Sequence, residues 1–251
     1  MEGFNRGVNM ILKDSYKVTT LILARGGSKG VPRKNLKKVG KHSLVERAVK
    51  SAFSSTIVDR VVVSTDDKEI AEEAKRCGAE VPFLRPEYLA QDDTDQMEVI
   101  DYTIKRLGYE GYQDKDKRII VSLNPTVPFR TGYDVFTALD LLNLDKEASG
   151  VVSVCETSQH PNWTKKLYGN NYIKSFIDNN LCYRRQDLPE CYSLNGAIFA
   201  TTLDLLLKYK TFYSGNTIGY VMPSERGAID IDTEWDIYLA NLVAKDKDAR
   251  A

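Results

Sequence analysis

The sequence predicts a three-layer α/β fold built on a mostly parallel sheet. Short apolar runs alternate with amphipathic segments along the first part of the chain, in the order strand, helix, strand, helix. Strands joined through helices pair in parallel, and the helices then cover both faces of the sheet. A length of 251 residues suffices for one large domain. We therefore expect a flexible tail over residues 1–18 and a single domain over residues 19–251.

The first expected element is a buried strand over residues 19–23, which runs into a loop rich in glycine and cations. Glycine reaches backbone angles closed to other residues, so successive N–H groups can converge on an anion. Ser28 lies in this loop and Asn35 directly after it. The glycines are Gly26, Gly27 and Gly30, and the cations are Arg25, Lys29 and Lys34. This composition predicts a phosphate-binding loop, with a simple tight turn as the alternative; it matches neither the Walker A loop nor the dinucleotide fingerprint.

Further strands and helices alternate up to residue 142. Ser43 and Glu46 have capping-box spacing and predict the start of a helix. Asp66 is expected to cap a second helix, which Gly78 closes, and Thr94 to cap a third. The strands expected here are residues 60–65, 80–84 and 117–123, and another helix is expected through residues 135–142.

Two of these strands end in polar residues that suit ligand binding. Arg85 follows one strand and precedes Pro86, so its guanidinium is held where it can bind a carbonyl or a phosphate. Asn124 opens a proline-stiffened loop after the next strand. The carboxyl ends of strands in open α/β sheets are where ligands bind, which makes this edge the expected site.

Residues 156–190 interrupt the regular pattern and predict an arm or small flap after a strand over residues 150–155. The segment is rich in asparagine, cations and aromatic residues such as Trp163, Tyr168 and Tyr172. Exposed aromatic groups usually contact a partner surface, so we expect a two-fold homodimer. Regular elements resume with strands over residues 195–199 and 217–222, a helix over residues 203–207, and a last helix capped by Thr233.

Asp230 and Asp232 form an Asp-x-Asp motif. On a strand, residues two apart point the same way, so both carboxylates would lie on one face while Ile229 and Ile231 point to the other. Two neighbouring carboxylates repel unless a cation lies between them, and hard oxygen ligands beside an anionic substrate favour Mg²⁺. The alternative is that one aspartate only caps the last helix.

Composition excludes several other functions. Lysine plus arginine equals aspartate plus glutamate, at 35 each, so no overall positive field favours nucleic-acid binding. Four cysteines form no Cys-x-x-Cys pair and are expected to be reduced thiols. Residues 1–18 lack the apolar core of a signal peptide or membrane span. Neither His42 nor His160 has triad or metal-ligand spacing, so we expect no catalytic role for either and find no support for hydrolase chemistry.

The loop sequence Ala-Arg-Gly-Gly-Ser-Lys-Gly-x-Pro-x-Lys-Asn, from residue 24 to residue 35, resembles the signature of the acylneuraminate cytidylyltransferases, or CMP-sialic acid synthetases. The resemblance extends from Leu21 to Leu242. It implies a Rossmann-like nucleotidyltransferase fold with a dimerisation arm, and a reaction in which CTP and an acidic nine-carbon sugar give a CMP-sugar and pyrophosphate. It further implies a cytoplasmic enzyme, or a nuclear one if the source is a vertebrate-like eukaryote.

The resemblance also implies roles for individual residues. Arg25, Ser28, Lys29 and the glycines would hold the triphosphate, while Lys34 and Asn35 approach the α-phosphate and ribose. Arg85 would bind the cytosine ring. Asp230 and Asp232 would hold Mg²⁺, for which Mn²⁺ can substitute. The residues implied on the sugar side are Asn124, Arg185, Asn195 and Lys165, the last supplied by the neighbouring subunit and interchangeable in sequence with Lys166.

Two departures from the family pattern fall on the sugar side. Asn124 stands where the family commonly has glutamine, and Phe199 stands where a tyrosine is often found, which removes a hydroxyl group. The nucleotide loop is intact, so the sugar is the least determined part of the reaction. The alternatives are a transferase of the same fold that uses another nucleotide, such as GTP with an amino-sugar phosphate, and a catalytically silent nucleotide-binding protein.

Overall fold

The computed structural model describes residues 16–177 and 184–250, without the side chains of residues 185 and 247–250. Most of the expected tail and Cys182 lie outside these ranges. Within them, a six-stranded sheet has the spatial order β10 (Thr217–Val221), β6 (Gly150–Glu156), β9 (Tyr192–Thr202), β5 (Arg118–Leu123), β1 (Lys17–Leu23) and β4 (Arg60–Ser64). Only β9 runs antiparallel to its neighbours. The predicted α/β fold with a mostly parallel sheet is confirmed.

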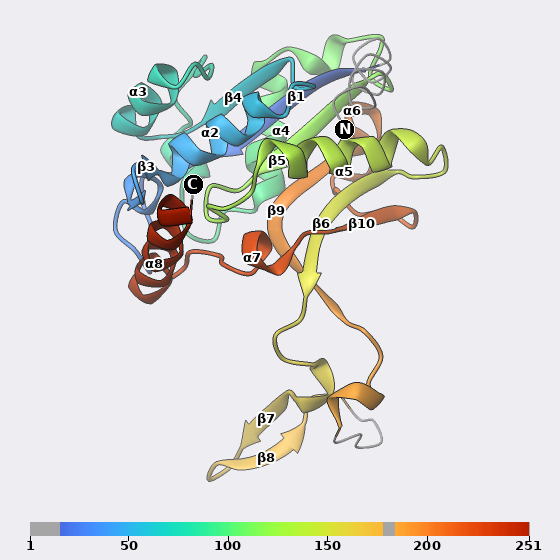
Figure 1. Ribbon diagram of the computed structural model, residues 1–251. Coiled ribbons are helices and arrows are strands. Elements are labelled where there is room, and N and C mark those ends of the chain that lie inside the picture. The colour runs from blue at the N-terminus through green and yellow to red at the C-terminus, as the bar shows by residue number, and fades with distance from the viewer. Residues whose placement is uncertain (1–15, 178–183, 251) are drawn as a thin grey trace.

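Helices cover both faces of the sheet (Figure 1). On one face, α2 (Leu44–Ser54), α3 (Lys68–Arg76) and α5 (Gly132–Leu144) contribute to the larger hydrophobic core. On the other, α4 (Gln96–Arg106) and α6 (Leu203–Tyr209) enclose a second core around Leu21, Val62 and Ile120. The strands therefore bury side chains on both faces, which is why their sequences read as continuous apolar runs.

A third, smaller core fixes the C-terminal helix α8 (Glu234–Arg250) against the first part of the chain. Ala240 and Ala244 of α8 pack with Val39, in the hairpin of β2 (Lys38–Val39) and β3 (His42–Ser43), and with Leu44, which directly follows that hairpin. Ile231, just before α8, is fully buried in the same core. This packing brings the Asp-x-Asp motif to the glycine-rich loop, about 200 residues earlier in the sequence.

The strand register places three loops at one edge of the sheet. Leu23 of β1 pairs with Ser64 of β4, and Ile22 pairs with Leu123 of β5, so all three strands end at the same level. The loops that follow them start at residues 24, 65 and 124. As predicted, the glycine-rich loop and Asn124 therefore meet at one carboxyl edge of the sheet.

Three local predictions were wrong. Asp67, not Asp66, caps α3, accepting the N–H groups of Glu69 and Ile70. Asp95, not Thr94, caps α4. Residues 80–84 form no strand; Glu80 and Leu84 make isolated parallel bridges to the β4 edge, too far apart to build a ladder. In both helices, an aspartate one residue later offers its carboxylate to the free N–H groups.

The segment expected to form an arm projects from the body of the molecule (Figure 1). It carries an antiparallel hairpin of β7 (Lys165–Tyr168) and β8 (Tyr172–Ser175), which has no strand pairing with the main sheet among the described residues. Leu167 and Ile173 are about two-thirds exposed, at 70% and 65%. The hairpin is marginal by itself, since two strands bury little apolar surface.

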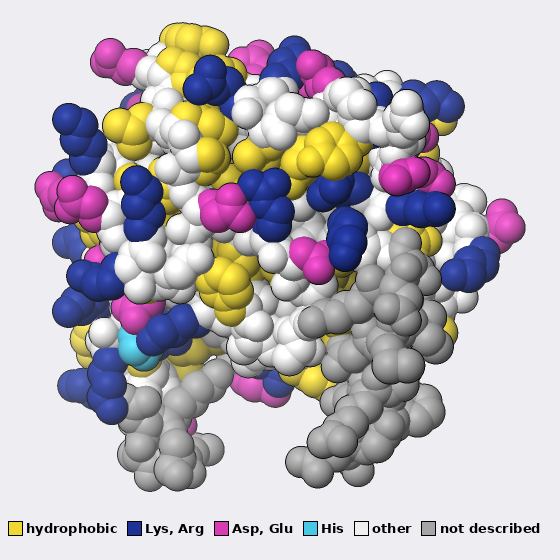
Figure 2. Space-filling model, turned by 90° about the horizontal axis from the view of Figure 1, so that it is seen from above, with side chains coloured by type: hydrophobic (Ala, Val, Ile, Leu, Met, Phe, Trp, Pro, Cys, Tyr) yellow, Lys and Arg dark blue, Asp and Glu magenta, His cyan; other side chains and the backbone are white. Residues whose placement is uncertain are grey.

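Short elements complete the described structure: the helical turns η1 (Lys34–Leu36), η2 (Glu87–Leu89), η3 (Tyr109–Gly111), η4 (Pro161–Trp163) and η5 (Arg185–Asp187), and the helix α7 (Ser224–Gly227). No helix in residues 16–177 and 184–250 is long and apolar enough to cross a membrane. Cations and anions are interspersed over the face opposite the arm (Figure 2).

Candidate active site

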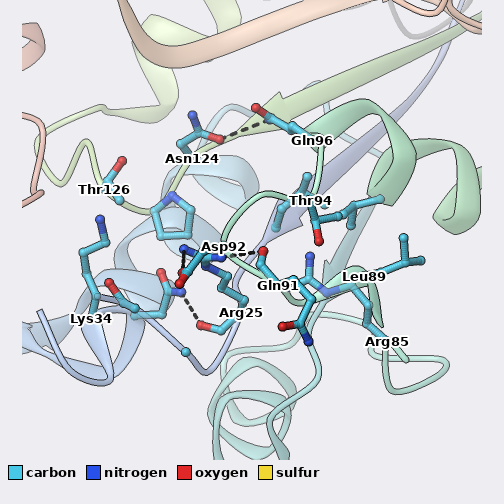
Figure 3. Close-up of a pocket in the computed structure, with 16 residues that line it drawn as sticks. Arg25, Lys34, Arg85, Leu89, Gln91, Asp92, Thr94, Gln96, Asn124 and Thr126 are labelled. Atoms are coloured by element: carbon cyan, nitrogen blue, oxygen red, sulfur yellow. Dashed lines mark hydrogen bonds and ion pairs between the residues drawn. The ribbon is translucent and has the colours of Figure 1, made fainter. Parts of the chain in front are cut away.

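A cleft of about 260 Å³ opens at the carboxyl edge of β1, β4 and β5. Lys34 and Thr126 lie on one side of it and Arg85 and Leu89 on the other (Figure 3). Many of the residues predicted to bind nucleotide or sugar line this cleft. They are Arg25, Gly27, Ser28, Lys34, Asn35, Arg85 and Asn124.

The glycine-rich loop is fixed from both ends. The Asn35 side-chain amide donates to the Arg25 carbonyl oxygen at 2.9 Å, and Asp66 accepts the Gly26 N–H at 3.0 Å. At Gly30, an added Cβ atom would lie 2.1 Å from the Asp232 carbonyl oxygen. Only glycine permits this approach, so the loop packs directly on the Asp-x-Asp segment. Asp66 thus orders this loop rather than capping a helix.

An aspartate that the sequence did not single out neutralises two cations of the loop. The Asp92 carboxylate lies 2.7 Å from Nη2 of Arg25 and 2.9 Å from Nζ of Lys29. Arg25 also donates to the Gln91 carbonyl oxygen at 2.6 Å. The hydrogen bond from Lys29, followed by the charges of Lys29 and Arg25, lowers the pKa of Asp92. The cradle therefore binds a carboxylate of its own chain.

Arg85 is a buried cation whose hydrogen bonds are incomplete. Its side chain is 4% exposed, and its Nε and Nη2 atoms have no hydrogen-bond partner. Asp66 faces Nη2 at 3.6 Å, which is an ion-pair distance rather than a hydrogen bond. Burial lowers the pKa of Arg85, although Asp66 opposes the shift. Unpaired buried donors are costly, so this guanidinium is prepared for an acceptor on a ligand.

Asp230 and Asp232 lie in an irregular loop between α7 and α8, not in the predicted strand. Ile231 between them is fully buried, and its N–H donates to the Thr126 carbonyl oxygen at 2.9 Å. Asp230 and Asp232 flank Ile231 as exposed residues, but the carboxyl group of Asp230 is partly enclosed beside Thr126. Lys34 bridges the loops, donating to the Ile231 carbonyl oxygen at 2.8 Å and to Asp232 at 3.0 Å.

The electrostatics of this loop fit a hard divalent cation. Burial of its carboxyl group raises the pKa of Asp230; the nearby Asp232 adds to the rise, whereas a hydrogen bond with Thr126 opposes it. A cation would relieve the repulsion between the two carboxylates. The described residues contain no group of three or more His, Cys, Asp or Glu side chains able to hold a metal. Mg²⁺ here would therefore take its other ligands from substrate phosphates and water, as Mg²⁺ commonly does.

A second cavity, of about 290 Å³, adjoins the cleft through Gln96, which lines both. The Gln96 side-chain amide donates to the hydroxyl oxygen of Ser122 at 3.2 Å and to Asn124 at 3.4 Å. Met97, Phe199, Phe212 and Tyr213 provide most of the lining. The cavity is therefore apolar and aromatic at the end of the cleft where Asn124 lies.

Two residues predicted to bind the sugar, Asn195 and Lys165, are not among the described residues that line the cleft, and a third, Arg185, is described only by its backbone. Asn195 is buried, and its oxygen accepts from the Ser153 hydroxyl at 2.6 Å and the Ala197 N–H at 3.1 Å. Lys165 lies on the arm and donates to Ser175 at 3.1 Å, whereas Lys166 lies over the Phe176 ring. Arg185 is in η5, but its side chain lies outside the described residues.

A buried polar network that the sequence did not reveal holds two segments next to the site, the Asn124 backbone and α7. Arg130 donates to the carbonyl oxygens of Asn124 at 3.0 Å and Ala197 at 2.8 Å, and burial lowers its pKa to about 10. Fully buried Asp134 accepts from Tyr220 at 2.8 Å and pairs with Arg226 of α7 at 3.0 Å. This pair anchors α7, which leads directly into the Asp-x-Asp loop.

Known proteins are similar to this chain in sequence and in fold. A family model described as cytidylyltransferase matches residues 19–129. The CMP-N,N'-diacetyllegionaminic acid synthase of Legionella pneumophila is 33% identical over 222 residues, which cover 88% of this chain and 93% of that protein. An N-acylneuraminate cytidylyltransferase of Streptococcus agalactiae is 29% identical, over 88% of this chain and 51% of the relative. The solved structure of CMP:2-keto-3-deoxy-manno-octonic acid synthetase complexed with CTP aligns over 92% of this chain and 99% of that chain, with a TM-score of 0.65 and 17% identity, which shows the shared fold.

Proposed function

The chain belongs to the cytidylyltransferase family, and we propose that it transfers CMP from CTP to an N-acylated nonulosonic acid, releasing pyrophosphate. The single observation that carries the nucleotide half is the pairing of a cationic loop with a buried, unsatisfied arginine in one cleft. The phosphates of a nucleotide can bind the cationic loop, and the carbonyl group of its base can bind the arginine. The anomeric hydroxyl of the sugar attacks the α-phosphate, and pyrophosphate leaves.

The triphosphate is assigned to the glycine-rich loop. Arg25 and Lys29 supply charge, and the loop N–H groups and Ser28 supply hydrogen-bond donors. Lys34 is only 16% exposed and sits between this loop and Asp232, which suits contact with the α-phosphate. Asn35 holds the Arg25 peptide and lines the cleft beside the expected ribose. Phosphoryl transfer depends on such positioning and charge neutralisation, without a covalent nucleophile on the protein.

Asp230 and Asp232 are assigned to hold Mg²⁺. The ion, when bound, neutralises charge at the reacting phosphate. Lys34 already pairs with Asp232, so this lysine can exchange the carboxylate for a phosphate oxygen when nucleotide and metal enter together. The contact between Gly30 and the Asp232 carbonyl oxygen keeps the phosphate and metal loops in register.

The sugar is assigned to the aromatic cavity beside Gln96. Acyl methyl groups bury well against Met97, Phe199 and Tyr213, whereas a hydroxylated chain would lose hydrogen bonds there. Phe199 brings no hydroxyl group to this wall, and the shorter Asn124 is already engaged by Gln96. Both features favour a sugar with more acyl groups and fewer hydroxyl groups. Within the proposed class, we therefore assign a diacylated legionaminic-type acid over singly acylated neuraminic acid.

We assign the arm to the interface of a homodimer. Lys165 is on a hairpin that projects from its own domain and does not line its own cleft, so it can reach a sugar only in a partner subunit. Arg185, at the other end of the arm, is assigned to the sugar carboxylate because a guanidinium binds a carboxylate through two parallel hydrogen bonds. The exposed apolar residues of the hairpin would be buried in this dimer interface.

The test is pyrophosphate release with each of CTP, GTP, UTP and ATP, crossed with diacetylated legionaminic, N-acetylneuraminic and pseudaminic acids and an amino-sugar phosphate. We expect turnover only with CTP and a nonulosonic acid, and the highest kcat/KM with the diacetylated acid. Phe199→Tyr restores a hydroxyl group and should shift the preference towards N-acetylneuraminate. Turnover with GTP and a sugar phosphate would reject the function; equal kcat/KM for the three acids would reject only the finer assignment.

A further inference from the structure

The Asp92 carboxylate fills the cradle that the proposed function assigns to phosphate. It contacts both Arg25 and Lys29, at 2.7 and 2.9 Å. In Figure 3, Asp92 lies between the Lys34 side of the cleft and the Arg85 side. A carboxylate that pairs with two cations satisfies them in the way a phosphate oxygen would. Two cations of the proposed nucleotide site are thus already paired with an anion of the protein itself.

This ion pairing competes with phosphate binding, because the carboxylate neutralises the same two cations that a phosphate would contact. Arg25 is also bound by the Gln91 carbonyl oxygen, so residues 91 and 92 together occupy two of its donors. The Lys29 side chain is 82% exposed, and among the described residues its Nζ atom pairs with the Asp92 carboxylate. A ligand that takes these donors must first displace Asp92.

We propose that Asp92 competes with the β- and γ-phosphates of the nucleotide for Arg25 and Lys29; this proposal rests on the proposed function. Binding of a ligand then depends on the number of phosphates that it carries. CTP and pyrophosphate bring enough charge to displace one carboxylate from both cations. CMP does not reach those cations, so Asp92 remains in place beside it. After the reaction, return of Asp92 to Arg25 and Lys29 favours departure of pyrophosphate.

The pairing is exposed enough to be weak and salt-dependent. The Asp92 side chain is 37% exposed, and exposed ion pairs contribute little each because water and salt screen them. We therefore expect the competition to change affinity by about three- to tenfold, not by orders of magnitude. Raising the salt concentration should reduce this factor.

The test compares Asp92→Asn with Asp93→Asn. Asparagine keeps the size of Asp92 and removes its charge, and Asp93 is the exposed next residue, which does not line the cleft. Dissociation constants are measured by titration calorimetry with Mg²⁺ for CTP, pyrophosphate and CMP. Asp92→Asn should tighten CTP and pyrophosphate by a similar factor, leave CMP unchanged, and lower the inhibition constant of pyrophosphate in turnover. Asp93→Asn should change none of these.

Each other outcome is decisive. If Asp92→Asn weakens CTP or pyrophosphate, Asp92 orders the site or holds the metal, and the competition is rejected. Unchanged affinities, or equal tightening of CMP, reject it as well. If the wild-type protein binds neither CTP nor pyrophosphate, the proposed function itself fails. Lys29→Ala should weaken pyrophosphate in both the wild-type and Asp92→Asn backgrounds, which separates loss of the cradle from loss of its competitor.

Discussion

Gly30→Ala tests whether the phosphate loop and the metal loop act as one unit. The added Cβ atom would lie 2.1 Å from the Asp232 carbonyl oxygen, whereas Cβ atoms essentially never approach another heavy atom within 3.0 Å. One of the two backbones must therefore move by at least the difference, 3.0 − 2.1 = 0.9 Å. A displacement of about 1 Å in a catalytic arrangement can reduce the rate by about 10²-fold.

The expected result is a kcat/KM for CTP lowered by about 10²-fold, together with a higher Mg²⁺ concentration for half-maximal rate. Both loops are at the surface, so the fold should survive, and the thermal unfolding midpoint should change little. Pyrophosphate release at varied CTP and Mg²⁺ measures the first two quantities, and calorimetry measures the third.

Gly111→Ala is the matched control, because no atom lies within 4 Å of the Cβ position at Gly111 and this residue is not in the cleft. It should retain wild-type kinetics. If Gly30→Ala also retained wild-type kcat/KM and Mg²⁺ dependence, the contact between the loops would have no part in catalysis, and the coupling would be refuted.

Four further substitutions test other parts of the site. Asp230→Asn and Asp232→Asn should each lower turnover by about 10²-fold or more at saturating Mg²⁺, because each removes one of the two carboxylates assigned to the ion; near-normal turnover in both would reject the metal site. Asp134→Asn should lower the free energy of unfolding by about 3 kcal/mol, because it removes the buried carboxylate that pairs with Arg226 and accepts from Tyr220. Burial by itself would raise the pKa of Asp134, but hydrogen bonds from Thr131, Arg226 and Tyr220 lower the pKa overall. The ionised Asp134 carboxylate therefore stabilises the fold fully above the ordinary pKa of 3.8, and this stabilisation is lost as the pH falls through the lowered pKa. Denaturant unfolding between pH 3 and pH 7, about the range that brackets this change, should show the wild-type advantage shrinking at the acidic end, and an advantage independent of pH would contradict the assignment. Arg185→Ala should raise the KM for the sugar acid while the dissociation constant for CTP stays normal, and weaker CTP binding with unchanged sugar kinetics would place the arm at the nucleotide instead.

Much of the fold was predictable because local patterns and tertiary packing agree. The apolar run before the glycine-rich loop forms β1, and Ser43 caps α2 by accepting the Glu46 N–H. Thr233 likewise accepts the Asp236 N–H at the start of α8. The wrong caps at Asp66 and Thr94 share one cause: an adjacent aspartate competes for the same N–H groups, and sequence spacing does not separate neighbours. Residues 80–84 look like a strand, but they lie at the open edge of β4 and pair there only at two points.

The sequence by itself determined the chemistry available to this protein: the alternating apolar and amphipathic segments of an α/β fold, the cationic glycine-rich loop and the Asp-x-Asp motif. These features are local, since each depends on residues within a few positions of one another. Tertiary structure alone decided which charges meet. Asp66 orders the Gly26 peptide, Asp92 neutralises Arg25 and Lys29, and Asp134 holds α7 through Arg226. Each of these contacts joins residues about 40 to 90 positions apart, and their pairing follows from where the strands end in space rather than from any spacing in the chain.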